Sequence, residues 1–285
     1  MFKLIIQRIR RYSDKHQKYY IWFILQKNPF RIITSPWRKL PEFIIIGCTR
    51  SGTVALNKYL NQHNHIEMAS RKEVHFFNKN IHYEQGLKWY KSFFPIKIFN
   101  KKIISGEATP DYIYNPNVPE RIKKILPNVK LIIVLRDPID RAYSHYNYMK
   151  RTGREDLTFE NAIKTEEDRI GNEREMKKFD SDNYRRYSYL DRGLYLKQIQ
   201  NWRKFFLKDQ ILIIKNEDLE ENVESTVNDV FTFLGIEKQI IPNRKKFNVG
   251  KYPPIKKETK SKLILHFKEH NKKLEEFLDR KFNWN

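Results

Sequence analysis

The chain has 285 residues, with 56 Lys and Arg against 34 Asp and Glu, so its formal net charge is +22. A hydrophobic fraction of 40% and an aromatic fraction of 14% supply apolar surface for a core and exclude an intrinsically disordered chain. The length suits one large domain. The charge favours a polyanionic partner, such as an acidic glycan, nucleic acid, an anionic membrane surface or a phosphate-bearing cofactor.

Cysteine usage and the N-terminal pattern indicate the cellular setting. Cys48 is the only cysteine, which excludes an intrachain disulfide and a cysteine zinc cage and favours a reducing compartment, the cytoplasm. The longest apolar run near the N-terminus, residues 19–25, is well short of the roughly 20 residues that span a bilayer. Residues 1–38 are expected to form a basic, aromatic extension that contacts an anionic membrane or a partner peripherally.

Strands and helices alternate along the rest of the chain. Residues 42–46 are β-branched and aromatic and lie between Pro41 and Gly47, which predicts a buried strand, and a helical pattern follows from Thr53. Further strands are expected at 129–135 and 210–214, and helices at 139–151, 195–206 and 220–234. This order predicts a P-loop-like three-layer α/β/α sandwich around a central parallel sheet.

Two later segments depart from that order. Residues 152–188 are dense in charged side chains and predict a variable insertion of exposed helix and loop, with a mobile stretch near 172–183. Residues 258–280 carry apolar side chains on one helical face and predict a closing helix. The domain proper is expected to span residues 39–285.

The turn after the first strand has the spacing of a phosphate-binding loop. Gly47 and Gly52 are separated as in a Walker-type loop, and the following helix N-terminus adds partial positive charge. However, Thr53 and Val54 stand where the G-x-x-x-x-G-K-[ST] motif has its lysine and its Mg²⁺-binding hydroxyl. A loop-coordinated metal is therefore disfavoured. Two interpretations remain, a phosphate-cradling loop with Arg50 as its cation and an ordinary strand-to-helix turn.

The end of the strand at 129–135 offers a second phosphate site. Arg136 follows the strand directly, and Ser144 lies about two helical turns further on. Because ligands of parallel sheets bind outside the carboxyl ends of the strands, Arg136 and Arg50 are expected to face one crevice. Two phosphate sites in one crevice suggest a nucleotide with phosphates at both ends. The alternative is a helix cap at Asp137 with solvated arginines.

Together with further motifs, these loops resemble the sulfotransferase superfamily that uses 3′-phosphoadenosine 5′-phosphosulfate (PAPS). The chain is most like the heparan sulfate O- and N-sulfotransferase branch and its bacterial relatives, over residues 41–284. The motifs that carry the resemblance are residues 47–53, 72–77, 106–112, 135–138 with Ser144, 233–235 and 250–253. Jointly they are specific, whereas each one alone is weak.

The resemblance implies which residues bind PAPS and its product, 3′-phosphoadenosine 5′-phosphate (PAP). Those implied for the 5′-phosphosulfate are Arg50, Ser51, Gly52, Thr53 and Ala55. Those implied for the 3′-phosphate are Arg136 and Ser144, and a late loop with Gly250 and Lys251 would close over the nucleotide. Relatives usually have a lysine at the position of Arg50, where it touches the bridging oxygen, and the planar guanidinium of arginine places its donors differently.

Sulfuryl transfer needs a base on the acceptor side and cations on the leaving side, and no metal. By resemblance to the E-x-H-F-F motif of the O-sulfotransferases, Glu73 is implied as the base and His75 as the residue that orients it or the acceptor. The resemblance to the N-sulfotransferases offers Glu107 as an alternative base, although Ala108 stands where a lysine commonly follows. The choice between Glu73 and Glu107 stays open at this point.

The expected function is transfer of a sulfuryl group from PAPS to a hydroxyl or amine of a carbohydrate. The basic surface favours an acidic polysaccharide, and no motif predicts a specific nucleic acid partner. A P-loop nucleotide kinase is the alternative enzyme, and a polyanion-binding module without turnover is the alternative from another class. Candidates to line an acceptor cleft are Tyr184, Arg185, Arg186 and Tyr187.

Overall fold

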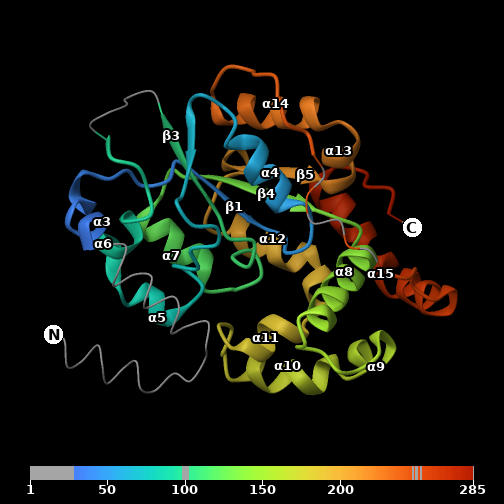
Figure 1. Cartoon of the computed structure of the whole chain (residues 1–285). Helices are drawn as coiled ribbons and strands as arrows, with labels where there is room; N and C mark the ends of the chain where they lie inside the picture. The colour runs from blue at the N-terminus through green and yellow to red at the C-terminus, as the bar shows by residue number, and fades with distance from the viewer. Residues whose placement is uncertain (1–28, 98–102, 246, 248–249, 251, 285) are drawn as a thin grey trace.

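A computed structural model describes residues 29–97, 103–245, 247, 250 and 252–284 (Figure 1). Within these ranges five strands form one sheet in the order β2-β3-β1-β4-β5, and every neighbouring pair is parallel. The strands are β1 (Phe43–Gly47), β2 (Ile66–Met68), β3 (Ile104–Ala108), β4 (Lys130–Leu135) and β5 (Ile211–Lys215). Lys251 and residues 1–28 of the expected N-terminal extension lie outside the described residues.

Helices cover both faces of the sheet. Alternate residues of a strand point to opposite faces, so each strand contributes apolar side chains to both sides. Ile44 and Ile46 of β1 belong to one hydrophobic cluster, whereas Phe43 and Ile45 belong to another. The first cluster includes residues of α6 (Gly86–Lys91), α7 (Val118–Ile125) and α12 (Tyr195–Arg203). The second includes residues of α4 (Thr53–Leu60), α13 (Asn216–Glu221) and α14 (Val223–Leu234). The expected three-layer α/β/α sandwich is thus confirmed.

A third cluster joins the expected insertion to the domain. It contains residues of α8 (Pro138–Arg151), α9 (Phe159–Lys164) and α15 (Lys257–Leu278), the expected closing helix. Two further helices, α10 (Glu166–Glu175) and α11 (Asp182–Tyr187), complete residues 152–188. Contrary to the expectation from its charge, the segment is not exposed throughout, because it buries several side chains: Phe159, Ala162, Ile170 and Tyr184.

Other boundaries differ from the expected ones. The helix expected over 220–234 is two helices, because Asn222 between α13 and α14 leaves the helical conformation with φ −127° and ψ 57°. Gly235 ends α14 in the left-handed region with φ 78°, as a helix C-cap does. The remaining short elements are α3 (Pro29–Ile33), η1 (Ser35–Trp37), α5 (Asn80–Tyr83), η3 (Asp191–Gly193) and η4 (Lys208–Gln210). None of the helices in the described ranges combines the length and apolar character needed to cross a bilayer.

Strand β3 packs closely against β1 and β2 at Gly106. A Cβ atom there would clash with the Phe43 ring and the Met68 sulfur. We therefore expect Gly106→Ala to lower the free energy of unfolding by about 1–3 kcal/mol, because a filled core cannot make room without strain. Chemical denaturation measures this change.

The matched control is Gly171→Ala, in α10. A Cβ there first meets the exposed carboxylate of Glu167, at 3.0 Å, and alanine favours a helix over glycine. This variant is expected to be at least as stable as the wild type. Equal stability of Gly106→Ala and the wild type would contradict the packing described for β3.

Candidate active site at the carboxyl edge of the sheet

The candidate site lies at one edge of the sheet, where β1, β3 and β4 end. The loop after β1 turns through Arg50 at φ 70° and Gly52 at φ 80° before α4 begins at Thr53. Gly52 is required here, because a Cβ atom would clash with the side-chain oxygen of Asn216 and the positive φ disfavours other residues. The first N–H groups of α4 have no acceptor within the helix. The positive end of the helix dipole therefore lies at this edge of the sheet.

Several features of this loop suit an anion. The implied residues Ser51, Gly52, Thr53 and Ala55 lie together at the start of α4. Ser51 is buried, and its hydroxyl has no hydrogen-bond partner among the described residues. A buried hydroxyl without a partner is costly unless a ligand satisfies it. The loop therefore fits the phosphosulfate end of PAPS.

Beside the loop, a cavity of about 250 Å³ is lined by Arg50 and by Ser144 of the second predicted group. The Arg50 Nε donates to Ser144 Oγ at 3.2 Å, and the Arg50 guanidinium lies 5.0 Å from the ring centre of Tyr148. Arg136 Nη1 donates to the Arg50 carbonyl at 3.3 Å. Gly250 also lines the cavity, as expected for the late loop.

The side chain of Arg50 is directed toward α8. The resemblance to lysine-containing relatives implies the 5′ end of the site for this residue, whereas its contact with Ser144 brings it beside a residue implied for the 3′-phosphate. Because Arg50 adopts a left-handed backbone conformation, its guanidinium leaves the loop and reaches Ser144 on α8. Arg50, Arg136 and Ser144 therefore form one group, which we call the cation pocket.

The cation pocket lacks a balancing negative charge. No carboxylate of a described residue lies within 4.0 Å of the cationic groups of Arg50, Arg136 or the neighbouring Arg151. Burial lowers the pKa of Arg50, and the charges of Arg151 and Arg136 lower it further. Cations gathered without a partner favour a phosphate ligand.

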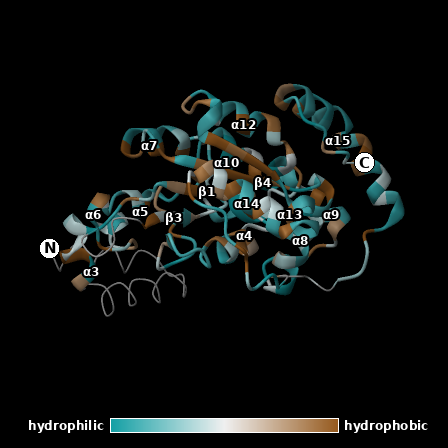
Figure 2. Cartoon of the chain, turned by 90° about the horizontal axis from the view of Figure 1, so that it is seen from above, coloured by the Kyte–Doolittle hydropathy of each residue, from teal (hydrophilic) through white to brown (hydrophobic). Residues whose placement is uncertain are grey.

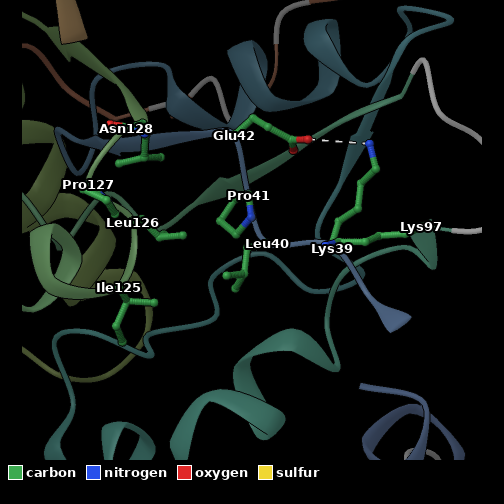
Figure 3. A pocket seen from close by; sticks show the side chains of 10 residues that line it. Lys39, Leu40, Pro41, Glu42, Lys97, Ile125, Leu126, Pro127 and Asn128 are labelled. Carbon is green, nitrogen blue, oxygen red and sulfur yellow. Dashed lines mark ion pairs between the residues drawn. The ribbon is translucent and has the colours of Figure 1, made fainter. Parts of the chain in front are cut away.

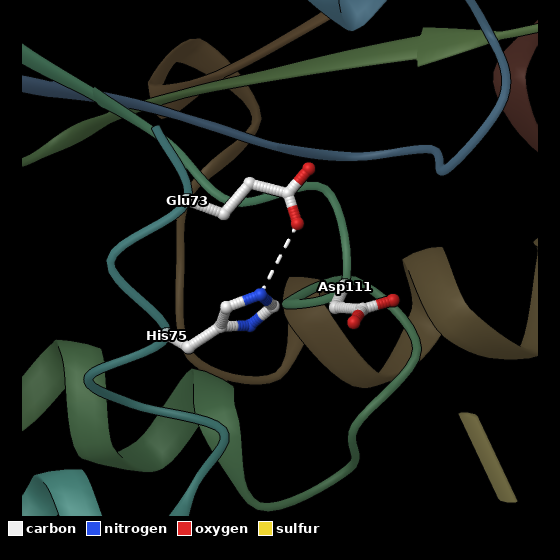
Figure 4. A group of neighbouring side chains, drawn as sticks. All are labelled: Glu73, His75 and Asp111. Carbon is white, nitrogen blue, oxygen red and sulfur yellow. Dashed lines mark ion pairs between the residues drawn. The ribbon is translucent and has the colours of Figure 1, made fainter. Parts of the chain in front are cut away.

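Next to the loops lies a second group, Glu73, His75 and Asp111 (Figure 4). Glu73 Oε2 is 3.1 Å from His75 Nε2, and Glu73 Oε1 is 3.2 Å from Lys72 Nζ. The His75 Nδ1 faces Asn78 Oδ1 at 3.2 Å, so both ring nitrogens face oxygen atoms. Burial raises the pKa of Glu73, but the hydrogen bond and charge of His75 and the charge of Lys72 outweigh it and bring that pKa below its usual value.

Asp111 connects this group to the rest of the site. Its Oδ1 accepts from Arg192 Nη1 at 2.9 Å and from Thr49 Oγ1 at 3.2 Å, and its Oδ2 accepts from Arg185 Nε at 3.0 Å. Burial would raise the pKa of Asp111, yet the charges of Arg192 and Arg185 hold it well below its usual range. The carboxylate is thus ionised and fully occupied by donors.

The same three side chains have the spacing of a metal site, since their ligand atoms lie within 4.8 Å of one another. Their surroundings oppose a cation. The guanidinium groups of Arg185 and Arg192 form ion pairs with Asp111. Lys72 forms an ion pair with Glu73. The donor set therefore suits an acid–base pair among cations better than a divalent ion.

Glu107, the alternative base, does not face the crevice. Its side chain has no exposed surface and accepts from Thr109 Oγ1 at 2.8 Å, from the Tyr112 hydroxyl at 2.7 Å and from the Tyr90 hydroxyl. Burial raises the pKa of Glu107, although the hydroxyl donors act against this rise. Glu107 is therefore a buried structural carboxylate under the cluster, and the structure favours Glu73 as the base.

Among the four candidates for an acceptor cleft, only Arg185 reaches the Glu73 group. Arg186 pairs with Asp182 at 2.7 Å, and the Tyr184 ring stacks on Tyr114 with centres 4.7 Å apart. The guanidinium of Arg169 lies 3.6 Å from the ring centre of Tyr187. These three residues hold α10 and α11 in place instead.

Arg192 and Lys79 are functional candidates that the sequence analysis missed. Arg192 is buried beside Asp111. Lys79 is close enough to Arg185 and Asp111 for their charges to act on it. The sequence offered no local signal for Arg192, because its burial and its pairing with Asp111, 81 residues away, follow from tertiary contacts. No signal in the sequence pointed to Lys79.

A second hollow of about 570 Å³ lies at the opposite, amino edge of the sheet (Figure 3). It is lined by residues 39–42 before β1 and 125–129 before β4, together with Lys97. Lys39 pairs with Glu42 at 3.5 Å on its rim. None of the predicted site residues lines it, so the chemistry is assigned to the carboxyl edge.

Comparison with known proteins supports the same assignment. The family model of the sulfotransferase domain matches residues 40–282. The membrane-associated sulfotransferase kil1 of Dictyostelium discoideum is 32% identical over 316 residues, covering 86% of this chain and 66% of kil1. Mouse heparan sulfate glucosamine 3-O-sulfotransferase 3B1 is 33% identical and mouse bifunctional heparan sulfate N-deacetylase/N-sulfotransferase 3 is 28% identical, over 77% and 85% of this chain. The chain spans only 53% and 30% of the length of these two.

The fold also matches a solved structure. A sulfotransferase from Alicyclobacillus acidocaldarius superposes with a TM-score of 0.69 over 86% of this chain and 98% of that one, at 24% identity. That likeness bears on the fold. Because the family model covers most of the chain, including every loop of the candidate site, the chain belongs to the sulfotransferase family, whose members take their sulfuryl group from PAPS.

Proposed function

We propose that this protein transfers the sulfuryl group of PAPS to a hydroxyl or amine of a carbohydrate. The observation that carries the proposal is the adjacency of two groups at one sheet edge, the unpaired cation pocket and the ionised carboxylate Glu73. A nucleotide kinase fits less well, because Thr53 and Val54 replace the Walker lysine and hydroxyl. A binding module without turnover does not require an ionised carboxylate such as Glu73 beside the cation pocket.

In this proposal the two ends of the donor bind to different groups. The cation pocket holds the 3′-phosphate, and the amides of the loop before α4 hold the 5′-phosphosulfate with the hydroxyl of Ser51. PAPS supplies a sulfuryl group on a phosphate leaving group. The 5′ end then depends on the helix N-terminus rather than on a lysine, with Arg50 assigned to the 3′ end.

Glu73 acts as the base. As the acceptor oxygen or nitrogen forms its bond to sulfur, its proton passes to the Glu73 carboxylate, while the sulfur–oxygen bond to the 5′-phosphate breaks and PAP leaves with the electron pair. His75 orients Glu73 through the 3.1 Å contact and is itself held by Asn78. No step requires a metal ion.

The surroundings of Glu73 favour an anionic acceptor. The negative charge of Glu73 acts on Arg185, and the positive charges of Arg185 and Arg71 act on Lys79. Burial lowers the pKa of Lys79 and the charge of Arg185 lowers it further, while Asp182 and Asp111 act in the opposite direction. A carboxylate or sulfate on the acceptor would give Lys79 a charge partner, as in an acidic polysaccharide.

We also propose that the protein works at a membrane surface in the cytoplasm. The single, buried Cys48 suits a reducing compartment. The relative kil1 is described as membrane-associated, and the formal charge of +22 favours anionic lipids.

Calorimetry with nucleotide fragments tests the donor site and the position of Arg50. We expect Arg50→Ala and Arg136→Ala to weaken PAP binding by about 10- to 100-fold, the loss of one charged hydrogen bond. Adenosine 5′-phosphosulfate, which lacks the 3′-phosphate, should bind equally to the wild type and Arg50→Ala. The control Arg203→Ala, on α12 at the far end from the pocket, should change neither affinity.

Other outcomes identify other accounts. Equal losses for both ligands in Arg50→Ala would place Arg50 at the 5′ end. Tight binding of ATP with Mg²⁺ in preference to PAP would support the kinase. No binding of any nucleotide would leave the polyanion-binding module.

The pH dependence of kcat/KM tests Glu73 and His75 together. Glu73 must be ionised to accept a proton and its pKa is lowered, so the acid limb of the wild type should lie below the usual value of about 4.3. His75→Ala removes the hydrogen bond and charge of His75, which lower this pKa more than Lys72 does, and leaves the burial that raises it, so the limb should move to higher pH. Glu73→Gln should lower kcat by about 10²- to 10⁴-fold at unchanged PAP affinity.

The control for this experiment is Glu84→Gln, an exposed carboxylate at the end of α5. It should behave as the wild type. An acid limb that does not move in His75→Ala, or a Glu73→Gln variant with full turnover, would contradict the assigned base.

Paired acceptors test the preference for negative charge. We expect Lys79→Ala to lower kcat/KM for a polysaccharide of uronic acid and glucosamine by about tenfold, because one charge contact to the acceptor is lost. A neutral polymer with the same hydroxyl groups should lose little. Lys88→Ala, an exposed lysine on α6, is the control. Equal losses on both polymers would show that Lys79 supports the fold and not acceptor recognition.

A further inference from the structure

The first described segment, α3 with η1, has its polar side chains turned inward. The Arg31 Nε donates to the Ser92 carbonyl at 2.6 Å, and the Arg38 Nη1 donates to the Phe94 carbonyl at 2.6 Å. Thr34 and Ser35 are buried between them. The two arginines thus clamp the segment onto the chain just after α6, which lies beside α3 (Figure 1).

The apolar side chains of the same segment point outward. Phe30 is 68% exposed, Ile33 is 69% exposed and Trp37 is 53% exposed. A spacing of three residues places Phe30 and Ile33 on one side of α3, and Trp37 is the last residue of the adjoining η1. This is the reverse of an ordinary surface helix, which buries its apolar side. Because the arginine clamp fixes the segment, the exposed side is a property of the folded domain and needs a partner.

The charge around this surface favours a lipid partner. Residues 1–28, which lead into it, contain seven basic residues against one acidic residue, Asp14. The basic residues are Lys3, Arg8, Arg10, Arg11, Lys15, Lys18 and Lys27. The same stretch has six aromatic residues: Phe2, Tyr12, Tyr19, Tyr20, Trp22 and Phe23. Aromatic and aliphatic anchors next to many cations are typical of surfaces that sit in the interface of an anionic bilayer.

We propose that Phe30, Ile33 and Trp37 form a docking surface for an anionic phospholipid bilayer. The proposal rests on the membrane contact proposed above and names the surface that makes it. In two views at right angles, α3 lies at one end of the molecule and α15 at the other (Figures 1 and 2). Docking through α3 would therefore leave the helices around α8, and with them the cation pocket, away from the lipid.

Vesicle sedimentation of the full chain tests the surface. The probes are vesicles of phosphatidylcholine alone and of phosphatidylcholine mixed with phosphatidylserine. We expect binding only to the mixed vesicles, decreasing as salt is added, and at least about tenfold weaker in the triple variant Phe30→Ala, Ile33→Ala, Trp37→Ala. The matched control replaces three equally exposed side chains elsewhere, Leu207, Ile240 and Leu265, with alanine and should bind as the wild type.

Each further result decides for or against the surface. In a Trp22→Phe background, which keeps Trp37, Trp89, Trp202 and Trp284, the fluorescence should shift to the blue on mixed vesicles and not on neutral ones, and the shift should be lost when Trp37 is also replaced by Phe. Unchanged binding by the triple variant would overturn the proposal, as would a dimer in sedimentation that the triple variant dissociates. PAP affinity, measured on the same samples, should be equal in all variants, so a failure of docking is separable from a failure of the donor site.

Discussion

The buried carboxylate of Asp111 is the interaction on which the site depends. It accepts from Thr49 in the loop after β1, from Arg185 on α11 and from Arg192 on η3. Three separate parts of the chain therefore meet at one charge. Removing one partner of a buried ion pair typically costs about 3–5 kcal/mol, because the other charge stays buried without a partner. The position of Arg185 over Glu73 is a consequence of this carboxylate.

Charge is distributed differently on the two sides of the site. On the proposed acceptor side, the carboxylates of Asp111 and Glu73 are held among Arg185, Arg192 and Lys72, which favours the ionised form of the proposed base. On the donor side, the cation pocket has no carboxylate partner among the described residues. The first arrangement fixes side chains, and the second is available to a ligand. This division follows from the parallel sheet, which brings loops with different charges to one edge.

Much of this arrangement could be predicted from the sequence. Continuous apolar runs predicted β1, β4 and β5, because strands buried on both faces tolerate few polar residues. The pattern did not predict β3, whose Ser105, Gly106 and Glu107 look like a loop and are buried only through tertiary contacts. Glu107 became a candidate base through the resemblance to the N-sulfotransferases, and the pattern gave no sign of its burial. The direction of the Arg50 side chain depends on its backbone conformation, and the pairing of Asp111 with Arg192 spans 81 residues. Local patterns carry neither kind of information.

The resemblance to a family implies residues for the two ends of PAPS, and we propose a different division between them. Here a single arginine of the phosphate loop faces α8 and not the loop amides. The most direct test of this account is a crystal structure of the protein with PAP bound. We predict the 3′-phosphate in contact with Arg50, Arg136 and Ser144, and the 5′-phosphate on the amides before α4 with Glu73 facing it across the crevice. A 3′-phosphate away from Arg50, or a nucleotide bound elsewhere, would contradict it.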